Sequence, residues 1–472
     1  MHLCKLDKLD GSPTGCKALH SLPSLSLETS VELMEKKGAM KDEGLLQYPF
    51  LFLLVLVVGL IFTDPFHLGP LGGHSYRPVK HDIAPYKVVM NQWPRDNQSR
   101  LRTGKLEFVG EVYGPESLEF DLEGRGPYTG LADGRVVRWL GNDVGWETFA
   151  LVSPTWSDRP CSNGVKSTTS KQSTHEQLCG RPLGLRFDQQ TGYLYIADAY
   201  YGLLVVSPRG GLATPLATHA EGKPILFAND LDIHRNGSIF FTDSSMRYNR
   251  LLLSAKDFMS EMIADSDFVL CCIHGIWRME PCYRNHFFVL LEGEATGRLL
   301  RYDPSSSTTH VVLHGLAFPN GVQISKDQTF LLFTETTNCR IMRYWLEGPR
   351  MGAVEIFANL PGFPDNIRLN EKGQFWVAID CCRTPIQEIM SHNPWIRNIY
   401  FRLPLKMKYL ARMIGMKMYT VISLFDEKGE ILDVLEDQRG EVMKLISEVK
   451  EVDGKLWIGT VKHNQIATFP FP

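Results

Sequence analysis

The sequence predicts an all-β protein, a six-bladed β-propeller with an N-terminal transmembrane signal-anchor helix. Two observations lead to this prediction. A unit of strand, polar turn and more apolar strand recurs six times, and a long uncharged stretch precedes the first copy. The chain has 472 residues, of which 44% are hydrophobic, and a formal net charge of -3. This near-neutral balance gives no electrostatic reason to expect a nucleic-acid partner.

The uncharged stretch runs from Leu45 to Thr63 and reads LLQYPFLFLLVLVVGLIFT. A helix of this length nearly crosses a hydrocarbon core of about 30 Å. A cleaved signal peptide is the alternative, but no small-residue cleavage site follows. Lysines precede the stretch and the first base after it is Arg77. This bias predicts a single-pass type II protein with residues 1–44 in the cytosol. The propeller would lie in the lumen of the endoplasmic reticulum or endomembrane system, in the vacuole, or at the cell surface.

Other features agree with an oxidising, lumenal compartment. Cys161 and Cys179 bracket a polar loop, and we expect a disulfide bond between them. Asn97 and Asn236 begin acceptor sequences for N-glycosylation. Residues 64–104 are expected to form a linker that leads into the propeller, and residues 105–472 the propeller itself.

The repeated unit sets the number of blades. Its copies begin at residues 117, 184, 230, 321, 366 and 447. The second and third copies begin 46 residues apart and the fourth and fifth 45 apart, a length typical of a four-stranded blade. A β-sandwich, the competing all-β fold, would not show a repeat of this length. In the fifth copy, strands are expected on both sides of a tight turn at 371–373.

One position of the repeat, just before the first strand of a copy, carries oxygen-bearing side chains in four copies. They are Glu116, Asn229, Asn320 and Asp365, with Asn366 adjacent; the other two copies have Leu183 and Ile446 there. Because blades are related by rotation about a central axis, these side chains should form a ring at one depth of the channel. Two carboxylates with amide oxygens suit Ca²⁺ better than Zn²⁺. The alternative is that these residues only stabilise turns, where Asn and Asp are common.

Four motifs, together with the predicted anchor, point to a family. They are LCGRPLGLRFD, FPNGVQIS, PGFPDNIRLN and KLWIGTVKHN. From Met40 to the end, with one interruption, the chain resembles strictosidine synthase-like proteins of the adipocyte plasma membrane-associated type, with the character of a plant member. The wider superfamily includes paraoxonases and gluconolactonases, propellers with a catalytic calcium. The resemblance implies that Glu116, Asn229, Asn320, Asp365 and Asn366 bind calcium, and that the protein hydrolyses esters or lactones, as arylesterases do.

Besides hydrolysis, two other functions remain open: amine–aldehyde condensation and binding of a partner without catalysis. Strictosidine synthase condenses an amine with an aldehyde and depends on a glutamate in the last blade. The corresponding residue here is Ser447, and the following Glu448 should face the other side of its strand. At the position of the histidine that is proposed as the base in paraoxonases, this chain has Asp198-Ala199-Tyr200. Asp243 and His463 are the candidate bases instead, because each follows an inner strand. A propeller that only binds a partner remains the third possibility.

Two further segments stand out. Residues 395–418 carry six Lys or Arg and no acid, interleaved with apolar residues, a pattern typical of interfacial helices. We expect them either to touch the membrane near the channel mouth and deliver a small apolar ester or lactone, or to form a lid packed on the outer blade. Residues 251–284, predicted on the connection between the third and fourth blades, form an atypical insertion, and residues 1–39 look extraneous.

Overall fold

The computed structural model describes residues 49–63, 65, 76–162, 175–250, 285–381, 383–403, 405, 409, 412–413 and 419–471. The chain divides into two compact units, Met1–Pro65 and Phe66–Pro472. The predictions for residues 1–44 and for 251–284 themselves lie outside the described residues.

In the first unit, the described residues 49–63 form a helix whose large apolar side chains are mostly exposed. No helix within the described parts of the chain is long and apolar enough to span a membrane. The anchor at Leu45–Thr63 therefore stays a prediction.

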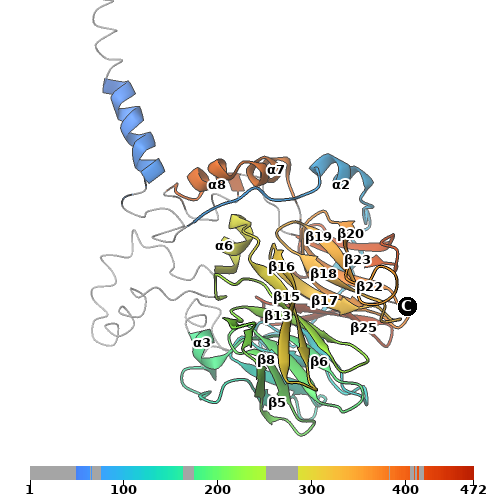
Figure 1. Ribbon diagram of the computed structural model, residues 1–472. Helices are drawn as coiled ribbons and strands as arrows, with labels where there is room; N and C mark the ends of the chain where they lie inside the picture. Colours follow the sequence, from blue (N-terminus) through green and yellow to red (C-terminus); the bar gives the residue numbers. More distant parts are fainter. Residues whose placement is uncertain are drawn as a thin grey trace, which may run out of the picture. The chain divides into compact units, whose positions relative to one another are not determined.

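The second unit is a propeller of six blades, as the repeat predicts (Figure 1). The first blade has β2 (Leu118–Glu119), β3 (Tyr128–Gly130), β4 (Arg135–Trp139) and β5 (Trp146–Leu151), with β9 (Gly211–Leu212) parallel to β5. The second has β6 (Pro182–Phe187), β7 (Leu194–Asp198), β8 (Gly202–Val206) and β10 (Thr214–Ala217). A small hairpin of β11 (His219–Ala220) and β12 (Lys223–Pro224) follows.

The remaining blades have the same antiparallel order. The third has β13 (Ala228–Ile233), β14 (Ile239–Asp243), β15 (Gly297–Asp303) and β16 (Thr308–Leu316). The fourth has β17 (Pro319–Ile324), β18 (Phe330–Glu335), β19 (Arg340–Trp345) and β20 (Val354–Asn359). The fifth has β21 (Phe363–Leu369), β22 (Phe375–Cys381), β23 (Tyr419–Phe425) and β24 (Ile431–Asp437).

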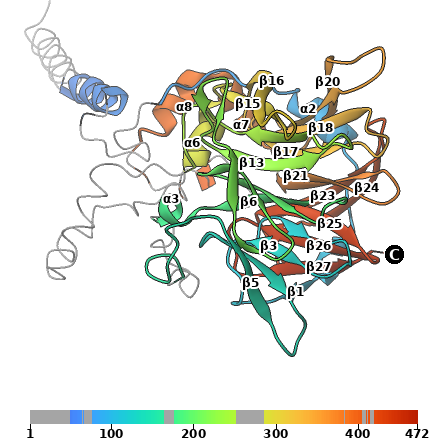
Figure 2. The same ribbon diagram turned by 60° about the horizontal axis from the view of Figure 1, so that its bottom comes forward.

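The sixth blade joins the two ends of the propeller. It contains β25 (Ile446–Val452), β26 (Lys455–Thr460), β27 (Ile466–Pro470) and, at its outer edge, β1 (Lys105–Glu107), which pairs with β27. Through this pairing, the segment that begins at Lys105 forms the outer edge of the last blade. Innermost strands β6, β13, β17, β21 and β25 follow one another around the centre (Figure 2).

Apolar clusters between blades form the core. Between the fourth and fifth blades, Phe330, Ile367 and Phe375 pack together, each almost fully buried. Both faces of an inner strand are covered by neighbouring blades, so β18 (FLLFTE) is buried along its whole length. The turn after β21 contains Gly373 at φ +85°, a conformation that favours glycine. This confirms the predicted hairpin.

Helices and an extended segment cover one end of the propeller. They are α2 (Tyr86–Gln92), α6 (Asn285–Glu292), α7 (Pro385–His392) and α8 (Pro394–Tyr400) (Figure 1). Residues 76–84 are bound to these helices, since the Val79 N–H donates to the Glu292 carbonyl at 2.8 Å and the His81 N–H to Ser391 at 3.0 Å. We call α6, α7, α8 and residues 76–84 the cap. Two shorter helices, η1 (Arg100–Thr103) and α3 (Glu176–Cys179), lie elsewhere in the second unit.

Three further predictions can be compared with the structure, although exposure alone does not test glycosylation. Cys161 and Cys179 form a disulfide bond between the first and second blades, as predicted. Asn97 and Asn236 are both exposed, although the Asn236 side chain also accepts the Ser238 N–H at 2.9 Å. The predicted location of the 251–284 insertion between two blades is wrong. Its flanking strands β14 and β15 pair with each other inside the third blade.

Candidate metal centre

The predicted ligands lie where the innermost strands are irregular. The pairing register shifts between Ala228 and Leu231 in β13, between Pro319 and Val322 in β17, and between Pro364 and Ile367 in β21. These intervals contain four of the five predicted ligands: Asn229, Asn320, Asp365 and Asn366. Bulges of this kind redirect side chains and are common beside functional sites. The sequence placed the residues before the strands, whereas the structure places these four inside them.

Glycines let the innermost strands approach closely at this depth. A Cβ atom on Gly321 would lie 2.6 Å from the Asn366 Cα, and one on Gly184 would lie 2.8 Å from the Asn229 carbonyl oxygen. On Gly459, it would lie 2.1 Å from the Glu116 carbonyl oxygen. Any side chain there would push the ring residues apart. The glycines therefore fix the spacing of the ring.

Two of the ring amides are oriented by hydroxyl groups. The Asn229 amide nitrogen donates to Ser244 Oγ at 3.0 Å, and the Asn320 amide nitrogen donates to Thr336 Oγ1 at 3.3 Å. The amide oxygens of Asn229, Asn320 and Asn366 are buried and accept no hydrogen bond from any described residue. Buried polar atoms without a partner are costly, so three in one ring mark it as a candidate ligand-binding site.

The same two hydroxyls also tie neighbouring blades together. Ser244 Oγ donates to the Pro319 carbonyl and Thr336 Oγ1 to the Pro364 carbonyl, both at 2.7 Å. Each hydroxyl therefore connects the amide of its own blade to the bulged strand of the next blade. Such contacts hold ligand side chains in a defined orientation.

The two carboxylates of the ring repel each other. Burial, followed by the charge of Glu116, raises the pKa of Asp365 well above its ordinary value. Burial also raises the pKa of Glu116, although Arg181 Nη2 lies 3.5 Å from its Oε2 atom. Asp365 is hydrogen-bonded to Asn320 and Ser447. A cation between the carboxylates would remove this repulsion.

This donor set fits a hard cation. It offers two carboxylates and three amide oxygens, as Ca²⁺ prefers. Across the described ranges, no group of three or more His, Cys, Asp or Glu side chains could hold a metal ion. The ring contains only two such residues, so a cation bound there would also need the amide oxygens as ligands. The ring therefore matches calcium by its chemistry, with Asp365 as its partly accessible member.

Asp243, the first candidate base, is part of a buried ion pair. Its carboxylate accepts from Arg298 at 2.6 and 3.0 Å and from the Phe227 N–H at 2.9 Å. Asp198 and Glu335 stand at the corresponding ends of β7 and β18 and also accept backbone N–H groups at the start of their blades. Asp243 thus belongs to a repeated structural contact, and its carboxylate is already engaged.

His463, the second candidate, lies in the connection between β26 and β27. Its carbonyl accepts from the Gly114 N–H, two residues before Glu116, at 2.8 Å. Its Nε2 atom is buried and has no hydrogen-bond partner in the described structure. Burial, followed by the charge of Lys462, lowers the pKa of His463. The imidazole is therefore neutral at neutral pH and can accept a proton.

Asp380 is a further acidic residue, near the ring, that the sequence prediction missed. It accepts a hydrogen bond from the Ile446 N–H, and its charge acts on Asp365. Its Oδ1 atom is buried without a hydrogen-bond partner among the described residues, and burial raises its pKa to about 7. Asp380 lies near the end of an inner strand, the same criterion that selected Asp243, so the sequence contained the signal.

Comparison with known proteins identifies the family. Models described as strictosidine synthase and as strictosidine synthase-like, N-terminal, match residues 280–349 and 100–139. Protein STRICTOSIDINE SYNTHASE-LIKE 13 of Arabidopsis thaliana is 63% identical over 442 residues, covering 93% of this chain and 99% of the relative. The chain belongs to the strictosidine synthase-like family. It is also 33% identical over 376 residues to the adipocyte plasma membrane-associated protein of Homo sapiens, covering 77% of each chain.

Solved structures with a similar fold are more distant from this strictosidine synthase-like chain. A gluconolactonase from Xanthomonas campestris has a TM-score of 0.45 at 15% identity, covering 84% of this chain and 98% of that one. Regucalcin from Agrobacterium tumefaciens, a calcium-binding protein, has a TM-score of 0.42 at 12% identity, covering 77% and 92%. Similarities at this level say nothing about the chemistry of the chain.

In this member of the strictosidine synthase-like family, neither residue at the predicted glutamate slot offers a free carboxylate. Ser447 lies in the irregular part of β25 beside Asp365 and accepts from the Val461 N–H at 2.8 Å. Glu448 is fully buried; its oxygens accept from Ser117 Oγ and the Leu118 N–H, both at 2.8 Å, and it pairs with Arg368. These contacts occupy Glu448.

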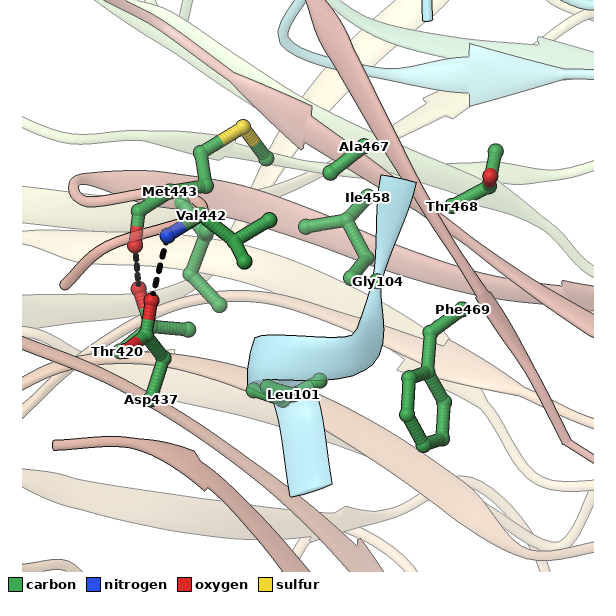
Figure 3. A pocket seen from close by; sticks show the side chains of 11 residues that line it. Leu101, Gly104, Thr420, Asp437, Val442, Met443, Ile458, Ala467, Thr468 and Phe469 are labelled. Atoms are coloured by element: carbon green, nitrogen blue, oxygen red, sulfur yellow. Dashed lines mark hydrogen bonds between the residues drawn. The ribbon is translucent and has the colours of Figure 1, made fainter. Parts of the chain in front are cut away.

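A small cavity lies between η1 and the fifth and sixth blades (Figure 3). Leu101, Thr420, Asp437 and Met443 contribute to its lining, and its volume is about 10 Å³. Thr420 Oγ1 donates to the Met443 carbonyl at 2.6 Å, and the Val442 N–H donates to Asp437 at 2.8 Å. A space for about one water molecule cannot admit a substrate.

Proposed function

We propose that the protein is a calcium-dependent hydrolase of esters or lactones, resembling arylesterases. Glu116, Asn229, Asn320, Asp365 and Asn366 would hold the cation. The observation that carries the proposal is the ring of three buried amide oxygens without partners beside two mutually repelling carboxylates. The names of the distant gluconolactonase and regucalcin structures are consistent with it but do not support it independently.

Bound calcium would polarise the substrate carbonyl and stabilise the developing oxyanion. The chain's own residues would do the rest. Ser244 and Thr336 hold the ring amides in place. His463 is the candidate acceptor of the proton from the attacking water, because its imidazole is kept neutral. Asp243 has no place in this scheme, since Arg298 engages its carboxylate.

Apolar side chains next to the ring favour an apolar substrate. Leu183 occupies the ring position of the second blade, while Phe227 and Phe318 precede Asn229 and Asn320 by two residues. These three side chains form a buried cluster with Val289 of α6. Such surroundings bind apolar groups and exclude water from the carbonyl. The natural substrate class would therefore be a small apolar ester or lactone.

Two other functions compete with this proposal. Amine–aldehyde condensation is disfavoured, because Ser447 cannot act as the acid or base and Glu448 is engaged by Arg368. A binding module braced by calcium would share the ring but not the chemistry. Hydrolysis of an aryl ester by the full-length chain, measured with calcium, after chelation and after calcium is restored, separates these cases. Activity lost on chelation and regained with calcium supports the hydrolase; a folded, calcium-binding protein without activity supports the binding module.

The same proposal places the propeller in a lumen, attached to a membrane by Leu45–Thr63. The disulfide bond and the exposed Asn97 support this location. On the cap, Ile389 and Trp395 are 54% and 62% exposed, and Met413, which follows the cap in sequence, is 59% exposed. The neighbouring sequence is rich in bases. Such a surface suits contact with an anionic bilayer. Glycosidase sensitivity of the wild type, lost in an N97Q/N236Q variant, would test the lumenal location.

A further inference from the structure

A second layer of charged side chains lies next to the ring and contains its own cation. Arg368, which is 1% exposed, donates to Asp230 Oδ2 at 2.6 Å and to Asp230 Oδ1 at 2.9 Å. It also forms an ion pair with Glu448 and donates to Ser117 Oγ at 3.3 Å. These residues come from the first, third, fifth and sixth blades, so the guanidinium lies at the centre of the channel.

The second layer repeats the design of the ring. Ser117 and Asp230 directly follow the ring residues Glu116 and Asn229 in sequence. As in the ring, two carboxylates from different blades face the channel. Here, however, every carboxylate oxygen has a protein donor, since Asp230 also accepts the Val322 N–H at 2.8 Å and Glu448 the Leu118 N–H. The guanidinium of Arg368 lies between the carboxylates of the second layer, in the position that corresponds to the proposed calcium ion in the ring.

The next layer also contains its own cations. Arg186 Nη1 lies 2.7 Å from Glu119 Oε1, and its Nε lies 3.1 Å from Asp232 Oδ1. Lys450 lies 2.5 Å from Glu119. Two acids therefore face two bases. As far as the described residues show, both of these layers contain basic side chains of the chain itself among their carboxylates.

We propose that Arg368 is a built-in cation that replaces a second metal ion in the channel. The chain then binds one divalent cation, at the ring, and folds without it. The stoichiometry of one rests on the proposed calcium ring, whereas the role of Arg368 in the second layer does not. Replacing the guanidinium by a neutral side chain should turn Asp230, Glu448 and Ser117 into a second calcium site.

The test uses the full-length chain and reads calcium stoichiometry by isothermal titration calorimetry, together with thermal unfolding in chelator and in calcium. The wild type is expected to bind one calcium ion and to stay folded in chelator. R368M is expected to bind two, and chelation should lower its unfolding midpoint by about 5 °C or more. R368K, which keeps the charge, is the matched control and should bind one. A D365A/R368M double variant should bind one, at the new site.

The outcomes separate this proposal from the proposed function. If the wild type binds no calcium but R368M binds one ion, the ring assignment fails and the role of Arg368 stands. If the wild type binds one ion and folded R368M also binds one, Arg368 does not replace a metal. Should R368M unfold in chelator, calcium added during refolding must rescue it; failure of that rescue also overturns the proposal, as would a wild type that unfolds on chelation.

Discussion

The ring and the second layer, which contains Arg368, are neighbours in the channel and are built from similar residues on the same strands. They differ in whether their buried oxygen atoms have hydrogen-bond partners. In the ring, the amide oxygens of Asn229, Asn320 and Asn366 have no partner within the described chain. In the second layer, all oxygens of Asp230 and Glu448 accept hydrogen bonds or pair with Arg368. In the first and third blades, the residue of the second layer directly follows the ring residue in the sequence.

This difference distinguishes a ligand-binding site, the ring, from a layer that stabilises the fold. Buried polar groups with complete partners contribute to a defined fold, whereas a cluster without partners is kept at a cost that a ligand can offset. Substitutions in the ring should therefore impair function and leave the fold intact. Substitutions in the second layer should instead lower the stability of the fold.

Replacing Asp365 with alanine should give the largest functional effect. We expect calcium-dependent hydrolysis to fall by about 1000-fold or more, because the ring loses one of its two charged ligands. The unfolding midpoint in chelator should stay the same or rise, since repulsion with Glu116 disappears. Activity assays and thermal unfolding would check both parts. Glu371→Ala, an exposed change in the turn of the same hairpin, is the control; a much less stable D365A protein would contradict the comparison.

Replacing Asp230 with alanine should instead destabilise the protein. It leaves Arg368 buried without its bidentate partner, and breaking such a pair typically costs about 3–5 kcal/mol. Denaturant unfolding with and without calcium would measure the change. Saturating calcium should not restore the lost stability, because the substitution leaves a positive charge that repels a cation. Equal stability of D230A and wild type would show that the second layer does not stabilise the fold.

Much of this arrangement could be predicted from the sequence. The repeat gave the number of blades, and rotation symmetry then brought Glu116, Asn229, Asn320 and Asp365 to one depth. The disulfide between Cys161 and Cys179 followed from the loop that they bracket. These inferences work because each depends on spacing along the chain. The predicted anchor and the lumenal location depend on residues or conditions that the structure does not test.

Contacts between distant segments could not be predicted in the same way. Arg298 lies 55 residues after Asp243, and only the paired strands β14 and β15 reveal that it engages this carboxylate. Arg368 and Asp230 are 138 residues apart. The bulges were also hidden, because one extra residue in a strand does not disturb a repeat of about 45 residues. Side-chain partners across the channel therefore had to come from the structure.

The pH dependence of calcium binding should sharpen the comparison further. The pKa values of Glu116 and Asp365 are raised in the metal-free fold, mainly by burial. Metal-free stability is therefore fully present below the ordinary carboxyl pKa of about 4 and falls as the pH rises through the raised values. Calcium needs the ionised carboxylates, so its affinity should rise over the same range. The gap between unfolding midpoints with calcium and with chelator should widen with pH. A gap that is constant, or that D365A retains, would contradict the ring assignment.

The smallest predicted effect concerns the hydroxyl that links the ring to the next blade. Thr336→Val keeps the shape of the side chain but removes the acceptor for the Asn320 amide and the donor to the Pro364 carbonyl. The lost hydrogen bonds should cost about 1–2 kcal/mol of unfolding free energy. Calcium affinity should fall about 10-fold, because the Asn320 oxygen is no longer held toward the ring. Thr309→Val, on the outer strand β16, should change neither quantity. If Thr336→Val lowers stability but leaves calcium affinity unchanged, the hydroxyl only joins the blades, and the orientation of Asn320 must come from the close contact of β17 with β21 at Gly321.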